Sequence, residues 1–165
     1  MKKWFLDLLI NKNAPIASVK ELLHLKYGFQ NRRESNDPTI LKSSWKQGEW
    51  QSEADEIVWV EKTSFGEVPC RIIRNAAGCL CGYVCIPSGH PYVRNEKEDD
   101  LGNIKCHGGV TYTSRENDFL IIGFDCAHFG DITPKMNNFK VGIYRNVSYV
   151  LNQILNIIEQ LSDTI

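Results

Sequence analysis

The sequence has 165 residues, of which 42% are hydrophobic and 24% are charged, and its net charge is −1. This length is sufficient for one domain with a substantial core, and the composition is ordinary for a globular protein in water. A charge so close to zero provides no global basic field, so neither polymeric nucleic acid nor an anionic membrane is an expected partner. The apolar run near the N-terminus is short and contains Asp7, and no small-residue cleavage site follows it. It therefore resembles neither a membrane span nor a signal peptide, and we expect a cytoplasmic protein.

The N-terminal quarter differs in character from the rest of the chain. Residues 1–12 and 15–28 have apolar side chains at helical spacing, and Gly28 is suited to end the second helix. The polar stretch after Gly28 contains a proline and is predicted to be a linker. We therefore expect a helical extension and linker over residues 1–44 and a core domain over 45–165. The two helices could mediate formation of a homo-oligomer.

The core domain is predicted to be α+β. Segments 56–62, 68–74, 79–86, 109–114 and 118–124 have the alternating or continuous apolar character of strands. The connections between the early strands are too short for crossover helices, so the sheet should be antiparallel. Asn146 is a suitable N-cap for a C-terminal amphipathic helix that packs on this sheet. Its apolar stripe comprises Val147, Val150, Leu151, Ile154, Leu155, Ile158 and Leu161.

The six cysteines are expected to be reduced packing residues. Cys79 and Cys81 form a C-x-C pair, but the chain has no matching second pair of the kind that zinc ribbons use. No cofactor and no bound metal are expected.

Three of the four histidines, His90, His107 and His128, lie within about a quarter of the chain, and Asp125 and Asp131 flank the last of them. The apolar segment 118–124 ends directly before Asp125, so these polar groups should lie at the rim of the core. Asp125 precedes His128 by three residues, a spacing at which a carboxylate can hold one ring nitrogen and fix the tautomer. This region is the candidate site.

The residues after His107 are suited to gripping a ligand. Gly108 and Gly109 allow positive φ and a close approach of the backbone to a phosphate or sugar. Thr111 and Tyr112 follow them and add hydroxyl groups. The predicted ligand-binding set is His90, Gly108, Gly109, Thr111, Tyr112 and Asp131.

Several chemistries could use these residues. His107 and His128 could act as acid and base on a phosphodiester, with Asp125 as the orienting group. His90, His107, His128 and Asp131 could instead bind a divalent metal, although the short ligand spacings typical of zinc sites are absent. Cys126 could act as a nucleophile beside His128. The histidines and aspartates could also only satisfy backbone groups in turns.

Three segments, CGYVCIPSGHP, HGGVTY and GFDCAHFGD, followed by the C-terminal helix, resemble a family of small phage and prophage proteins. The resemblance extends from about residue 68 to residue 161. Proteins of this kind are similar to phage anti-defence proteins that cleave or sequester nucleotide immune signals. The resemblance implies a small nucleotide ligand, met in the cytosol of a bacterial host. The expected function is cleavage of a cyclic dinucleotide by His107, His128 and Asp125. A non-catalytic sponge for a cyclic nucleotide or an ADP-ribose derivative, and a protein-binding accessory factor, are the alternatives.

Overall fold

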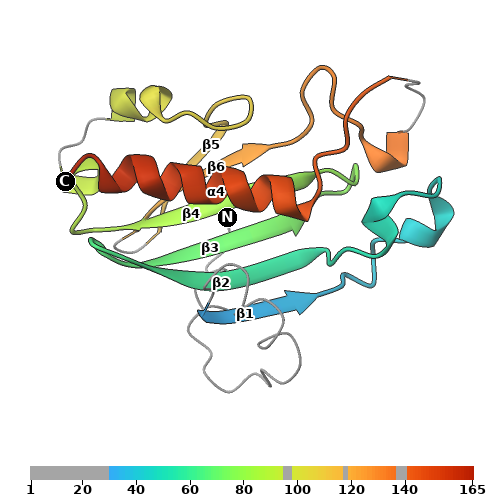
Figure 1. Ribbon diagram of the computed structural model, residues 1–165, viewed down its shortest axis with the longest axis horizontal. Helices are drawn as coiled ribbons and strands as arrows, with labels where there is room; N and C mark the ends of the chain where they lie inside the picture. The colour runs from blue at the N-terminus through green and yellow to red at the C-terminus, as the bar shows by residue number, and fades with distance from the viewer. Residues whose placement is uncertain (1–29, 95–97, 117–118, 137–140) are drawn as a thin grey trace.

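The computed structural model describes residues 30–94, 98–116, 119–136 and 141–165. The described residues form a six-stranded sheet in which every neighbouring pair of strands is antiparallel, with strand order β1-β2-β3-β4-β6-β5. The strands are β1 (Gln30–Ser35), β2 (Glu56–Thr63), β3 (Gly66–Arg74), β4 (Leu80–Pro87), β5 (Tyr112–Glu116) and β6 (Phe119–Asp125). One long helix among the described residues, α4 (Val147–Ser162), lies across one face of this sheet (Figure 1). The predicted α+β class is thus confirmed.

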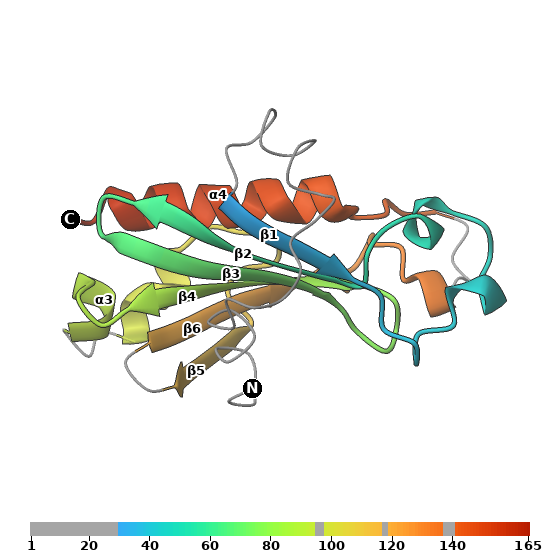
Figure 2. The same ribbon diagram turned by 90° about the horizontal axis from the view of Figure 1, so that it is seen from below.

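The helix and the strands form two layers, as the view turned by 90° makes clear (Figure 2). α4 packs on β4 and β3, and its buried residues are Val150, Leu151, Ile154, Ile157, Ile158 and Leu161. Each such aliphatic side chain contributes roughly 1.5–3 kcal/mol when it is fully buried. The side chain of Asn146 accepts a hydrogen bond from the backbone N–H of Tyr149 at 3.0 Å, so this residue is the N-cap that the sequence predicted.

The predicted helical extension over residues 1–28 lies outside the described residues. The predicted linker after Gly28 contains β1, which pairs with β2 at the edge of the sheet. The segment QNRRES has no apolar alternation, because an edge strand needs backbone pairing on only one side and little burial. The sheet therefore begins before the boundary that the sequence predicted at residue 44.

The smaller elements connect the strands and carry the loops. A short helix, α3 (Pro91–Arg94), follows β4. Turns of 3-10 helix are formed by Lys42–Ser44, Glu49–Gln51, Glu98–Asn103 and Pro134–Met136. Within the described part of the chain, none of the helices is both long enough and apolar enough to cross a membrane.

A buried arginine ties the loop before β2 to the chain that leads into α4. Arg74, at the end of β3, donates from Nε to Asp55 at 2.9 Å and from Nη1 to the hydroxyl of Tyr144 at 2.8 Å. Its Nη2 atom lies 3.2 Å from a carboxylate oxygen of Glu53, and Glu53 also accepts the backbone N–H of Val147 at 2.8 Å. We call these residues, Arg74, Asp55, Glu53 and Tyr144, the Arg74 cluster. The cluster fixes the start of α4 relative to the sheet.

Candidate functional site

The candidate site lies where the loop after β6 meets the start of α4. A parallel bridge joins Asp131 to Ile143, with Ile143 N donating to Gly130 O at 2.8 Å and Ile132 N to Ile143 O at 2.9 Å. This pairing places the loop beside the chain segment that enters the helix. Figure 1 shows the segment that follows β6 running past the first turn of α4. Residues that are far apart in the sequence therefore meet here.

Asp131 is the centre of the site. Its Oδ2 atom accepts a hydrogen bond from His107 Nε2 at 2.6 Å and another from the backbone N–H of His128 at 3.0 Å. Its Oδ1 atom accepts from Arg145 Nε at 2.9 Å. The side chain is 1% exposed. Burial by itself would raise the pKa of Asp131, but the hydrogen bonds from Arg145, His107 and His128 outweigh burial and hold the pKa below its ordinary value. Asp131 is therefore a buried carboxylate in its ionised form.

His107 is held on both sides of its ring. Nε2 faces the Asp131 carboxylate, and Nδ1 lies 2.9 Å from the hydroxyl of Tyr149. Since the ionised carboxylate can only accept, Nε2 carries the proton, and in the neutral ring Nδ1 accepts from the Tyr149 O–H. Arg145 places its guanidinium carbon 4.6 Å from the centre of the Tyr149 ring. Asp131, His107 and Tyr149 thus form a continuous chain of hydrogen bonds.

His128 has a different environment from His107. The two rings are edge to face, with centroids 5.2 Å apart. The Nδ1 atom of His128 is buried and has no hydrogen bond to the described residues; it lies 3.8 Å from Asp125 Oδ1 and 3.9 Å from Asp131 Oδ2. The carboxylates of Asp125 and Asp131 therefore both face this nitrogen. The side chain as a whole is 35% exposed. His128 is therefore the more accessible acid–base group of the pair.

The glycine after His107 makes the approach of His128 possible. Gly108 has φ of +67°, and a Cβ atom placed there would lie 2.1 Å from Cε1 and Nε2 of His128. Any other residue would strain the backbone and push the imidazole away. Gly109, with φ of +82°, has open space where its Cβ would be, and its N–H donates to Cys106 O at 3.0 Å. Gly108 is thus a packing requirement of the site.

Asp125 and Thr111 lie at the margin of the site. The Thr111 hydroxyl donates to Asp125 Oδ2 at 2.9 Å, and the N–H of Ala127 donates to Asp125 Oδ1 at 3.1 Å. At 3.8 Å from His128 Nδ1, Asp125 is beyond hydrogen-bond distance, so the orienting carboxylate of the histidine pair is Asp131, acting on His107.

Two of the predicted ligand-binding residues lie elsewhere. His90 is fully buried, with Nε2 3.0 Å from the carbonyl of Leu161 at the far end of α4 and Nδ1 accepting the N–H of Tyr92 at 3.3 Å. Both nitrogens are thus used within the fold. Tyr112 lies on β5, with its ring packed edge to face on Tyr83. We leave both out of the site.

Cys126 is also unsuited to the nucleophilic role considered from the sequence. Its side chain belongs to the core and is 2% exposed. Burial, together with the nearby carboxylates of Asp131 and Asp125, raises the pKa of its thiol. A buried thiol with a raised pKa carries little thiolate at neutral pH.

Tyr149 and Arg145 are the residues of the candidate site that the sequence did not predict. Both flank the N-cap of α4, where a tyrosine and an arginine read as ordinary surface residues of a helix start. The available signal was their position around the N-cap Asn146, one residue before it for Arg145 and three residues after it for Tyr149. Nothing local indicated that His107 would lie opposite.

Three of the residues could hold a metal ion. His107, His128 and Asp131 each offer a ligand atom, and these atoms lie within 4.8 Å of one another. Two imidazoles and a carboxylate suit a divalent transition metal. His107 Nε2 and Asp131 Oδ2 are, however, only 2.6 Å apart, which is hydrogen-bond geometry, so metal binding would require the two atoms to separate.

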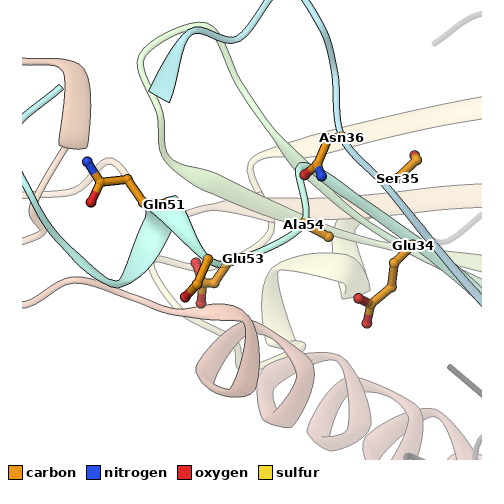
Figure 3. A pocket seen from close by; sticks show the side chains of 7 residues that line it. Glu34, Ser35, Asn36, Gln51, Glu53 and Ala54 are labelled. Carbon is orange, nitrogen blue, oxygen red and sulfur yellow. The ribbon is translucent and has the colours of Figure 1, made fainter. Parts of the chain in front are cut away.

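A polar recess of about 180 Å³ lies apart from the histidine pair, beside the loop that precedes β2. Figure 3 shows the side chains around it, and the lining comprises Glu34, Ser35, Asn36, Gln51, Ser52, Glu53 and Ala54. Glu53 is shared with the Arg74 cluster. None of the residues predicted for the site lines this recess.

Comparison with known proteins found no matching family model, no matching curated protein and no matching solved structure.

Proposed function

We propose that this protein cleaves a phosphodiester bond of a small nucleotide messenger by acid–base catalysis, with His107 and His128 as the acid–base pair. The observation that carries the proposal is the pair of imidazoles 5.2 Å apart, one held by a buried carboxylate and the other partly exposed. Proton transfers by two positioned imidazoles can assist cleavage of such a bond without a metal.

The two histidines have different roles in this proposal. Asp131 fixes the tautomer and the orientation of His107, as an orienting carboxylate does for a general base. His128, which is partly exposed and lies beside Asp125 and Asp131, supplies the proton to the leaving oxygen. Arg145 partly offsets the negative charge of the two aspartates, which favours the approach of an anionic phosphate.

The resemblance to small phage proteins supports the choice of substrate class. We infer a cyclic dinucleotide that serves as a bacterial immune signal, encountered in the cytosol of the host. Sequestration of an intact cyclic nucleotide or ADP-ribose derivative is the alternative function, and it would need the same polar groups without the proton transfers.

The test is incubation of the purified full chain with a panel of cyclic dinucleotides and cyclic ADP-ribose derivatives. Chromatography before and after heat denaturation separates new products from a ligand that is released intact. We expect products, and turnover about 10²–10⁴-fold lower in His107→Gln and in His128→Gln. Glu159→Gln, an exposed change near the end of α4, is the control and should leave turnover unchanged.

The other outcomes have distinct meanings. A ligand recovered intact after heating would replace cleavage by sequestration. Products that disappear with a chelator would assign the reaction to a metal held by His107, His128 and Asp131. Absence of both binding and products would argue for a protein-binding role.

A further inference from the structure

The contacts of His107 determine which group can transfer a proton to it. Both of its ring nitrogens are occupied within the protein, Nε2 by Asp131 at 2.6 Å and Nδ1 by the Tyr149 hydroxyl at 2.9 Å. Its side chain is 12% exposed. A water molecule or a substrate hydroxyl could reach neither nitrogen without displacing one of these partners. The one proton that His107 is positioned to accept is that of Tyr149.

From this geometry we propose that Tyr149 is the nucleophile of the site, activated by the hydrogen-bonded series Asp131–His107–Tyr149. The proposal rests on the proposed function for its substrate, a nucleotide phosphodiester, and specifies a covalent route for the cleavage. A carboxylate, an imidazole and a hydroxyl in series are the arrangement by which a base activates a weak nucleophile. Here the nucleophile is a phenol.

The neighbourhood of the phenol supports this role. The Arg145 guanidinium carbon lies 4.6 Å from the centre of the Tyr149 ring, so a fixed positive charge is present where phenolate charge would develop. Arg145 itself is anchored to Asp131 through Nε. The hydrogen bond from the Tyr149 N–H to Asn146 fixes the backbone at the start of α4. The phenol is therefore held on a rigid element next to its base.

The reaction proceeds in two steps. In the first, the Tyr149 proton passes to His107 Nδ1 and the phenol oxygen bonds to phosphorus. The bond from phosphorus to the leaving ribose oxygen breaks, and that oxygen takes a proton from protonated His128. In the second, water attacks the phosphotyrosine; its proton passes to His128, the phosphorus–tyrosine bond breaks, and Tyr149 recovers its proton from His107. The net result is hydrolysis of one phosphodiester.

A reactive probe tests the nucleophile without depending on the substrate. An alkyl phosphonofluoridate reacts with an activated hydroxyl by forming a phosphorus–oxygen bond and releasing fluoride, while the phenol proton remains on His107. We expect peptide mapping of the full chain to find label on Tyr149 at least tenfold faster than on Tyr92, which stacks on His90 away from the site. His107→Gln should slow this labelling by about 10²-fold.

The second measurement uses the nucleotide that the wild-type protein turns over. Acid quenching during turnover should trap an adduct of one nucleotide on Tyr149, visible in the intact mass. Tyr149→Phe should abolish the adduct and lower turnover at least about 10²-fold. Tyr92→Phe should change neither, and thermal melting identifies any variant that has failed to fold. A merely structural Tyr149 would produce no adduct.

The outcomes separate the two proposals. Turnover that persists within threefold in Tyr149→Phe, with no adduct in the wild type, would overturn the nucleophile and leave the proposed function standing. Selective labelling of Tyr149 without turnover of any nucleotide would support the nucleophile and overturn the substrate class. Labelling of Tyr149 at the rate of Tyr92 would overturn the nucleophile whatever the substrate.

Discussion

Two adjacent residues before α4 belong to two different polar clusters, and the clusters differ in how completely their buried polar groups are paired. Tyr144 belongs to the Arg74 cluster, while Arg145 belongs to the cluster of His107, His128 and Asp131. In the first, the guanidinium of Arg74 is fully buried and donates to side chains and to the carbonyl of Gly78. In the second, a ring nitrogen of His128 is buried without a hydrogen-bond partner in the part of the chain that the structure describes, and the ring itself is partly exposed. A satisfied buried network stabilises a fold, whereas an incompletely paired and accessible one is typical of a site.

The first test of this comparison replaces each of the two arginines by methionine. Arg74→Met leaves the carboxylate of Asp55, which is 1% exposed, without its arginine partner, so we expect a loss of about 3–5 kcal/mol in the free energy of unfolding. Arg145→Met also removes the arginine partner of a buried carboxylate, but Asp131 keeps its hydrogen bonds from His107 and from the His128 N–H. Because the Arg145 side chain is also 23% exposed, we expect a smaller loss of about 1 kcal/mol. Chemical denaturation measures both. Equal losses would contradict the division into a structural and a functional cluster.

A matched pair of glycine substitutions tests how closely His128 must be held. Gly108→Ala and Gly109→Ala both place a side chain at positive φ, which costs about 1–2 kcal/mol each. Only the Cβ at position 108 would meet His128. We expect similar melting temperatures for the two variants, and about 10²-fold lower turnover in Gly108→Ala alone, because displacement by about 1 Å can have that effect. Equal turnover would mean that the position of His128 does not matter.

The pH dependence of stability should report on His90. Burial lowers the pKa of His90, the hydrogen bond to Leu161 opposes this, and the charge of Arg94 adds to the lowering. The unfolded chain therefore binds a proton near pH 6.5 while the folded chain does not. The contribution of His90 is fully present above that pH and is lost as the pH falls toward the lowered pKa, by at most about 1.4 kcal/mol per pH unit.

Denaturation between pH 5 and 8, run in parallel on the wild type and His90→Gln, isolates this contribution. The variant should be less stable at pH 8 and should show a flatter dependence below about pH 6.5. If the free energy of unfolding of His90→Gln depended on pH as steeply as that of the wild type, the pH dependence would come from the other histidines.

The smallest effect is expected for the cysteine beside His128. Cys126→Ala removes a buried thiol from the core and should cost about 1 kcal/mol of stability. Turnover should stay within about twofold, because a thiol whose pKa is raised by burial supplies little thiolate. A loss comparable to that of His128→Gln would return Cys126 to consideration as a nucleophile.

The sequence by itself determined the elements whose stability is local or periodic. The strands from β2 to β6, the antiparallel pairing and α4 with its Asn146 cap all follow from apolar period, short connections and capping chemistry. The sequence did not predict β1, because a polar edge strand lacks the alternation of apolar residues by which strands are recognised. The region of the site was also visible, since His107, His128, Gly108 and the two aspartates stand close together in the sequence.

The tertiary structure alone decided which of these groups interact. The three-residue spacing of Asp125 and His128 suggested a partnership, but Asp131 is the carboxylate that holds a histidine, and the histidine is His107, 24 residues away. Tyr149 reaches His107 across 42 residues of sequence, and His90 is directed to the other end of α4. Such contacts depend on the packing of α4 against the sheet and on the bridge between Asp131 and Ile143. Local patterns carry no information about them, because the distance between two loops is set by the elements that hold them.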